Sequence, residues 1–191
     1  MTIRTTGMKL AMAAAILAAC AQPDAPPAQA APVPEPTPGT DRAVAVLHPT
    51  EGSSVSGLVR FEAHPDGVLV SVRVQGLTPG NHGFHVHEFG DCSRPDGTAA
   101  GGHFNPLDEP HAAREAHARH VGDLGNVTAD EEGGVETEYV DPMLGFAGAA
   151  SILGRGVIVH ADEDDLTTQP TGAAGGRVAC GVVGVAAPAE E

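Results

Sequence analysis

The sequence contains no tryptophan, a single tyrosine and a single lysine, Lys9. With so few large aromatic side chains, a core must be built from Val, Leu, Ile, Ala and a few Phe. Lys9 lies in the leader described below, so every cation of the remaining chain is an arginine. The net charge is −15, and it becomes −17 when residues 1–19 are removed, because they hold Arg4 and Lys9 but no acid. This charge argues against nucleic acid or an anionic membrane surface as a partner.

The first residues contain no apolar run long enough to span a bilayer. The apolar stretch of residues 10–19 is too short, but it follows two cations and ends in LAAC, so residues 1–19 have the layout of a secretory signal. LAAC is similar to a bacterial lipobox, in which Cys20 is lipidated; the alternative is an ordinary signal peptide with an incidental cysteine. Residues 20–41 are rich in Pro and Ala and predict an unpacked tether. We therefore expect a periplasm-facing lipoprotein with its lipid anchor at Cys20.

Cysteine is also scarce, with three in the chain. If Cys20 carries lipid, only Cys92 and Cys180 remain, and an oxidising compartment favours their pairing. The chain-entropy model credits the closure of so long a loop with about 4 kcal/mol, less any strain.

From residue 43 onward the sequence lacks helical periodicity. It consists of short alternating or apolar runs separated by turn signals such as HPDG, TPGN and DEEGG. Seven or eight strands predict an all-β sandwich or barrel in a domain of residues 42–187, with 188–191 as a tail. The expected strands lie within 43–48, 56–64, 68–77, 83–89, 125–140, 152–160 and 177–187.

Two segments, 90–122 and 161–176, are too long and too poor in apolar residues to be strands, so they are candidate functional loops. Within them, only residues 108–120 could hold a turn of helix.

Histidine, in contrast, is abundant: six of the ten histidines fall between residues 85 and 120. His85 and His87 are two apart in a β-prone run, so both point to one face of a strand. An isolated pair more often reflects one exposed and one core histidine. The other histidines, with Asp123 three residues after His120 and His160 ending the run GVIVH, instead indicate a metal site. Imidazole and carboxylate donors suit zinc and copper, whereas packed imidazoles without a cation would each need a hydrogen-bond partner.

Five motifs occur in order: GFHVHEFGD, GGHFNPLDEPH, RHVGDLGNVTAD, VIVHADEDDL and GGRVACGVVGVA. Together they resemble copper-zinc superoxide dismutase over residues 42 to 186, here of an exported bacterial lipoprotein type. The resemblance implies an eight-stranded Greek-key β-barrel, an immunoglobulin-like sandwich with two long functional loops. It also implies one copper and one zinc per subunit, and dismutation of superoxide to oxygen and hydrogen peroxide in defence of the cell envelope.

The resemblance also assigns the metal ligands. For copper they are His85, His87, His103 and His160, and for zinc they are His103, His111, His120 and Asp123. His103 would bridge the two ions and lose both ring protons, which only two flanking dications make favourable. Local geometry alone does not choose between His111 and His117, and the spacing of the family selects His111.

Further roles come from the same resemblance. Asp164 matches an acid that hydrogen-bonds one copper histidine and one zinc histidine, the alternative being a solvated acidic run. Arg177 matches the arginine that receives the anion, and with His103 it is the expected catalytic pair. His82 matches a barrel-packing position, whereas His48 and His64 are expected to be exposed.

One departure from the family concerns charge. Residues 161–176 contain no Lys or Arg, and Pro170 stands where a base is expected, so we expect weak electrostatic steering of the substrate.

Two other functions fit parts of this pattern. A non-catalytic copper-binding or copper-delivery module of the same fold could dispense with the bridge, the zinc ligands or the arginine, and this sequence retains all three. A structural lipoprotein stabilised by zinc would leave the copper set unexplained.

Small or apolar residues at the dimer positions of the family predict a homodimer, with a monomer as the alternative; they are Gly90, Leu153, Gly154 and Val185.

Overall fold

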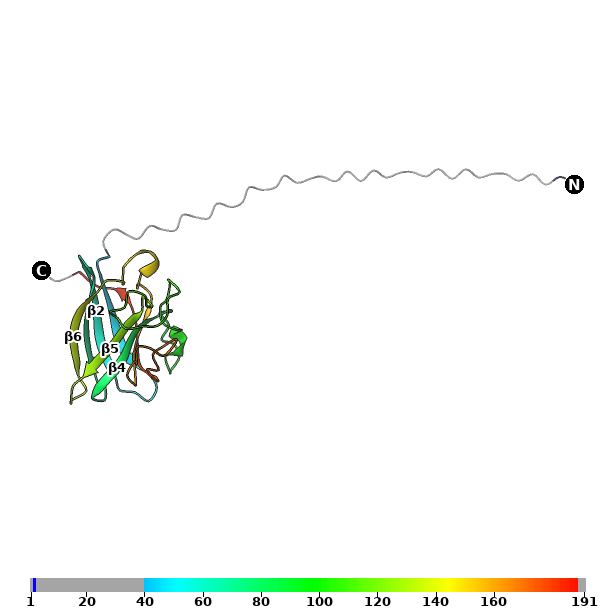
Figure 1. Cartoon of the computed structure of the whole chain (residues 1–191). Coiled ribbons are helices and arrows are strands. Elements are labelled where there is room, and N and C mark those ends of the chain that lie inside the picture. The colour runs from blue at the N-terminus through cyan, green and yellow to red at the C-terminus, as the bar shows by residue number, and fades with distance from the viewer. Residues whose placement is uncertain (1, 3–39, 189–191) are drawn as a thin grey trace. The chain divides into compact units, whose positions relative to one another are not determined.

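The computed structural model describes residue 2 and residues 40–188 (Figure 1). The predicted signal peptide apart from residue 2, the predicted lipidation site Cys20 and most of the predicted tether lie outside the described residues. Within the described part, no helix is both long enough and apolar enough to cross a membrane.

The described chain forms nine strands and two short 3-10 turns. The strands are β1 (Arg42–Pro49), β2 (Ser56–His64), β3 (Gly67–Gln75), β4 (Gly80–His87), β5 (Asp123–Ala129), β6 (Val135–Asp141), β7 (Gly156–His160), β8 (Arg177–Val182) and β9 (Gly184–Val185). The turns are η1 (Thr98–Ala100) and η2 (Gly148–Ala150).

Eight of the strands form one antiparallel path in the order β5-β4-β7-β8-β1-β2-β3-β6, and the short β9 pairs with β1. β1, β2 and β3 are consecutive neighbours, but the chain then crosses to β4 and β5, returns to β6 beside β3, and crosses again to β7 beside β4. These crossovers are Greek-key connections. The predicted all-β, eight-stranded antiparallel barrel is confirmed.

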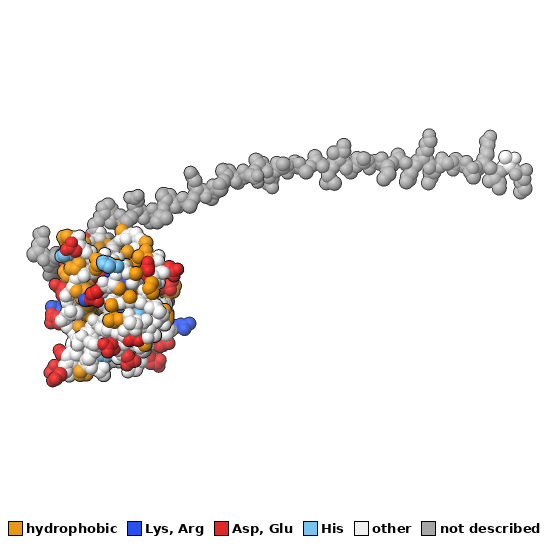
Figure 2. Space-filling view, viewed as in Figure 1, with side chains coloured by type: hydrophobic (Ala, Val, Ile, Leu, Met, Phe, Trp, Pro, Cys, Tyr) orange, Lys and Arg blue, Asp and Glu red, His pale blue; other side chains and the backbone are white. Residues whose placement is uncertain are grey.

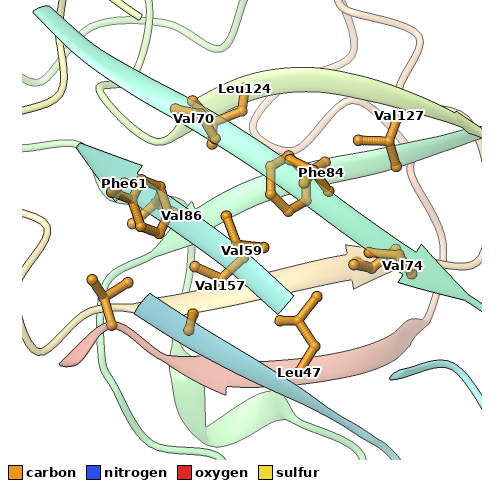
Figure 3. Close-up of a cluster of buried hydrophobic side chains, with 14 of the residues drawn as sticks. Leu47, Val59, Phe61, Val70, Val74, Phe84, Val86, Leu124, Val127 and Val157 are labelled. Carbon is orange, nitrogen blue, oxygen red and sulfur yellow. The ribbon is translucent and has the colours of Figure 1, made fainter. Parts of the chain in front are cut away.

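Alternation along the strands places the core inside this barrel. In β3 every second side chain is buried, at Val68, Val70, Val72 and Val74, as a strand with one face to the core requires. Phe61 of β2 and Phe84 of β4 are fully buried among valines from β2, β3 and β4 (Figure 3). Phenylalanine and branched aliphatic side chains thus fill the core of a chain that has no tryptophan.

Two long loops follow β4, which carries His85 and His87, and β7, which ends at His160. Residues 88–122 connect β4 to β5, and residues 161–176 connect β7 to β8. Both lie on the same side of the barrel in Figure 1, the first in green and the second in orange. We call them the β4–β5 loop and the β7–β8 loop.

The structure differs from the expected elements at two places. Residues 108–120 hold no helix: Ala116 N donates to Ala113 O in a single turn, and other polar groups of the segment bond to side chains outside it, such as Gln169 and Asp123. β7 begins at Gly156 and not near residue 152, because Arg155 N bonds back to Ile152 O in a turn at 3.0 Å.

A disulfide holds the beginning of the β4–β5 loop. Cys92 is bonded to Cys180 of β8, with Cα atoms 5.8 Å apart, as predicted from the number of cysteines. The bond anchors the loop to the strand that begins at Arg177.

A buried ion pair holds the other end of the same loop. Arg119 is fully buried, and its Nη2 donates to Asp141 Oδ2 at the end of β6 at 2.6 Å. The guanidinium also donates to three backbone carbonyls, those of Arg114, His120 and Val121. Asp141 Oδ1 accepts from the backbone N–H groups of Met143 and Leu144. Apart from the bond that joins the two side chains, the hydrogen bonds of this pair therefore go to backbone groups.

We expect Asp141→Ala to destabilise the protein by about 3–5 kcal/mol, because it leaves the Arg119 charge buried without its partner. The double variant Arg119→Met with Asp141→Leu should cost clearly less than Asp141→Ala alone, since it leaves no buried charge. Urea denaturation of the single and double variants measures both values. A cost below about 1 kcal/mol for Asp141→Ala would contradict a fully desolvated pair.

Candidate metal centre

Four histidines meet at one edge of the barrel. His85 and His87 lie on β4, His160 ends the neighbouring strand β7, and His103 of the β4–β5 loop forms a β-bridge with His87. All four are buried, and each offers one ring nitrogen within 4.8 Å of the others. We call this group the four-histidine set; it contains both residues of the H-x-H pair on one strand face, as the strand period requires.

A second group shares His103. The Nδ1 atoms of His103, His111 and His120 lie 2.7, 3.0 and 3.0 Å from Asp123 Oδ1. Three ring nitrogens and one carboxylate oxygen are a common tetrahedral donor set for zinc. We call this group the aspartate-containing set. His117 is exposed and belongs to neither set.

His103 is placed between the two groups. Its ring centroid lies 4.0 Å from that of His85 and 5.5 Å from that of His120. Its Nδ1 faces Asp123, while its Nε2 is buried without any hydrogen-bond partner. One ring thus presents one nitrogen to each set.

The unpaired nitrogens test whether these sets fit metal ions. Among the described residues, the buried ring nitrogens without a hydrogen-bond partner are His85 Nδ1, His103 Nε2 and His111 Nδ1. All three belong to the two sets, and leaving such atoms buried and unsatisfied is costly. A cation in each set would satisfy them, so the residues fit one ion of borderline softness in each set.

In His87 and His160, one ring nitrogen is fixed by a hydrogen bond to a backbone carbonyl. His87 Nδ1 bonds Gly101 O at 3.0 Å, and His160 Nδ1 bonds Gly175 O at 3.2 Å. Such bonds fix the tautomer and the ring orientation and leave the other nitrogen as the donor to a metal.

Asp164 joins the two sets from the β7–β8 loop. Its Oδ2 accepts from His85 Nε2 at 2.7 Å, and its Oδ1 accepts from His111 Nε2 at 2.9 Å. The side chain is 1 % exposed, so it does not belong to a solvated acidic run. Asp164 is itself held by Asn126 of β5, whose amide bonds its backbone N–H and C=O, both at 2.8 Å.

Arg177 lies next to the four-histidine set. Its Nη1 donates to Gly97 O at 2.6 Å and its Nη2 to Gly101 O at 2.5 Å. The Gly101 carbonyl also accepts from His87 Nδ1, so one oxygen holds both the guanidinium and a ring of the set. The side chain is only partly buried, and its charge can therefore reach an anion that approaches from solvent.

Comparison with known proteins agrees with this geometry. The family model for copper/zinc superoxide dismutase matches residues 55–183. This chain belongs to that family. It is therefore an oxidoreductase acting on superoxide, with one copper and one zinc per subunit as cofactors.

Individual relatives cover most of the domain. Superoxide dismutase [Cu-Zn] A of Xenopus laevis is 48% identical over 151 residues, which cover 75% of this chain and 97% of the relative. The extracellular superoxide dismutase [Cu-Zn] of Brugia pahangi is 41% identical over 157 residues, 78% of each chain. The crystal structure of the clock protein EA4 is similar, with 42% sequence identity and a TM-score of 0.71. The match covers 76% of this chain and 95% of the EA4 chain.

The remaining histidines belong to neither set of this dismutase. His82 is buried, with Nδ1 2.9 Å from the His160 carbonyl and Nε2 2.8 Å from the Thr78 carbonyl, so it packs beside the end of β7. His48 and His64 are exposed.

The sequence alone did not identify three residues that hold the site in place: Asn126, Arg119 and Gln169. The only signal for Asn126 was a carboxamide in an apolar strand run that begins at the predicted ligand Asp123. Arg119 adjoins His120 in the motif RHVGD, but nothing local shows that its partner is Asp141.

The buried rings of the four-histidine set resist protonation. Burial lowers the pKa of His85 to about 4, against the opposing hydrogen bond to Asp164. Burial, with the nearby His85, lowers the pKa of His160 to about 3. These rings are therefore neutral and can bind a metal without first losing a proton.

His111 behaves in the opposite way. Burial disfavours its charged form, but the carboxylates of Asp123, 3.0 Å from Nδ1, and of Asp164, which accepts from Nε2, outweigh burial and raise its pKa to about 9. The same contacts hold the pKa of both carboxyl groups well below the usual range, although burial opposes this. The contacts of His111 with two carboxylates thus favour its protonated form in the metal-free protein.

We expect the metal-free protein to be most stable near pH 6.5. As the pH falls from about 6.5 toward 3, the unfolded chain binds protons that His85 and His160 cannot take up when folded, so stability is lost, by about 1–3 kcal/mol at pH 5. As the pH rises from about 6.5 to 9, the stability contributed by protonated His111 is lost. Urea midpoints of the chelator-treated protein at pH 5, 6.5 and 9 test this. A midpoint that stays constant or rises from pH 6.5 to 5 would exclude buried neutral rings.

Proposed function

We propose that the four-histidine set is the copper site, that the aspartate-containing set is the zinc site, and that His103 bridges them. The observation that supports this most directly is the placement of His103, whose two ring nitrogens face the two sets from opposite edges. Zinc favours tetrahedral nitrogen and oxygen donors, and an all-nitrogen platform suits a copper ion that changes oxidation state.

The net reaction takes two superoxide ions and two protons to one oxygen and one hydrogen peroxide. Bound copper supplies the one-electron redox chemistry, and bound zinc supplies a fixed positive charge. Arg177 places the anion, because its guanidinium is held by Gly97 and Gly101 beside His87. His103 Nε2, the ring atom that no protein group occupies, would take up and deliver a proton only when it is not serving as a metal donor. Asp164 keeps the rings of His85 and His111 in the orientation that both sets require.

The test is metal analysis together with a superoxide-scavenging assay. The mature protein, offered both ions, should bind one copper and one zinc per chain and scavenge superoxide. Arg177→Ile should lower the rate by about ten-fold or more while both metals stay bound, because one charge-assisted contact to the anion is lost. His117→Ala, which changes an exposed histidine outside both sets, is the matched control and should keep the full rate. Uptake of a single ion per chain would exclude the two-metal assignment.

We infer that electrostatic steering is weak in this enzyme. The β7–β8 loop has no Lys or Arg, and Asp162, Glu163 and Asp165 on it are exposed. Figure 2 shows a face of the molecule on which acidic side chains greatly outnumber cations.

Raising the ionic strength from about 10 mM to about 150 mM should therefore change the dismutation rate by less than about two-fold, since salt screens an attraction that is small here. Stopped-flow rates at constant pH measure this. A rate that falls five-fold or more with salt would show strong attraction of the substrate.

We further propose that the protein acts at the cell envelope as a lipoprotein of the bacterial type, anchored through Cys20. The support is the leader: two cations, a short apolar stretch and LAAC, followed by a Pro/Ala-rich tether. The relatives named above come from a frog and a nematode, and one of them is named as extracellular. Mass spectrometry of the mature N-terminus tests the anchor, because an unmodified cysteine would contradict it.

The surface suggests a homodimer. Gly90 packs closely against Gly154 and Val182, and the side chains of Val182 and of the neighbouring Phe89 are exposed, as is that of Val185. A second copy would cover exposed apolar side chains, and the small residues would allow close approach. Sedimentation of the wild type beside Val182→Glu tests this; a wild-type protein that stays monomeric at micromolar concentration would contradict it.

A further inference from the structure

One side chain of the β7–β8 loop holds both backbone polar groups of His111. The His111 N–H donates to Gln169 Oε1 at 2.8 Å, and Gln169 Nε2 donates to the His111 carbonyl at 2.7 Å. His111 is 3% exposed, and no backbone group of the described residues bonds to its N–H or its C=O. Without Gln169, both groups would lose their only protein partner, and buried backbone groups are costly to leave unpaired.

The same loop also fixes the ring of His111. Asp164 accepts from its Nε2, so three hydrogen bonds from residues 164 and 169 determine where the ring lies. The remaining ring nitrogen, Nδ1, faces Asp123 at 3.0 Å. The position of this nitrogen therefore depends on a loop that supplies no member of the aspartate-containing set.

We infer that Gln169 is a positioning residue for zinc binding: its carboxamide clamps the backbone of His111 and so presents His111 Nδ1 to the other zinc donors. The inference rests on the proposed function, since it takes the aspartate-containing set as the zinc site.

The turn that carries Gln169 is itself well fixed. Asp165 Oδ1 accepts from the N–H groups of Thr167 and Thr168 at 2.9 and 2.7 Å. Gly172 closes the turn, donating to Thr168 O at 2.7 Å and accepting from Asp165 N at 2.8 Å. Gly172 has φ +66°, and a Cβ there would overlap Asp164 Oδ1 and His111 Nε2. Only glycine allows the turn to lie this close to the histidine that it positions.

A carboxamide is the side chain that suits this clamp. It offers an acceptor and a donor on neighbouring atoms, which match the N–H and the C=O of one residue. Methionine has a similar length but neither group, so Gln169→Met removes both bonds with little change in volume. Thr171→Ala is a matched control on the same loop, because no side-chain hydrogen bond of Thr171 occurs in the described structure.

The experiment measures zinc release from the copper- and zinc-loaded full chain to a chromogenic chelator. Gln169→Met should release zinc about 10–100-fold faster than the wild type, as is typical when a residue that supports a metal ligand is removed. Copper release should change less than about three-fold, because three of the four copper ligands lie on barrel strands or at their ends. Thr171→Ala should match the wild type for both ions.

Hydrogen exchange gives a readout independent of metal and activity. In the metal-free protein the His111 amide should lose protection in Gln169→Met, while the Asp164 amide, which Asn126 holds, should keep it. Equal zinc release from variant and wild type, or unchanged protection of the His111 amide, would overturn the inference. A wild-type protein that binds no zinc at all would instead overturn the proposed function.

Discussion

Everything at the site depends on one arrangement: buried imidazoles that each have one nitrogen anchored and the other turned toward a common point. Gly101, Gly175 and Asp164 anchor the rings of His87, His160 and His85. Because burial keeps these rings neutral, repulsion between them is small and their free nitrogens can converge. Without a cation, these converging ring nitrogens are buried and have no hydrogen-bond partner. This lowers the stability of the metal-free protein, and metal binding removes the penalty.

The barrel positions most of the four-histidine set, and the loops position most of the aspartate-containing set. β4 and β7 are paired in register, His85 with Ile158 and His87 with Gly156, so three of the four histidines sit on rigid neighbouring strands or at their ends. The aspartate-containing set comes mainly from the β4–β5 loop, whose regular structure among the described residues is limited to the short turn η1 and the bridge between His87 and His103. The Cys92–Cys180 bond and the Arg119–Asp141 pair hold that loop to the barrel at two places. Its middle, where His111 lies, is held by Gln169 and Asp164 of the opposite loop and by Asp123 of β5, which accepts from the Ala112 N–H at 3.2 Å.

The fold and the histidine pair on β4 could be predicted from sequence because their signals are local, whereas the full ligand sets came from the family resemblance. A period of two places His85 and His87 on one face, and turn signals mark where the strands end. His111 and His117 are different: both lie in the same irregular segment, and only the spacing of the family separates them. Gln169 and Asn126 were not found because their partners, His111 and Asp164, lie far away in the chain. A carboxamide in a loop carries no sequence signal for the backbone group that it will bind.

The charges of the protein act on an approaching anion differently at long range and at short range. The net charge and the acidic β7–β8 loop oppose the long-range approach of an anion, and salt screens such effects beyond about 10 Å. Close to the four-histidine set, the field is dominated by Arg177, which two glycine carbonyls hold beside His87, and by the two dications that the family binds. These short-range charges are partly shielded from solvent, so screening weakens them far less. On the roles proposed here, the enzyme depends on the last few ångströms of the approach, beside Arg177, more than on attraction from a distance.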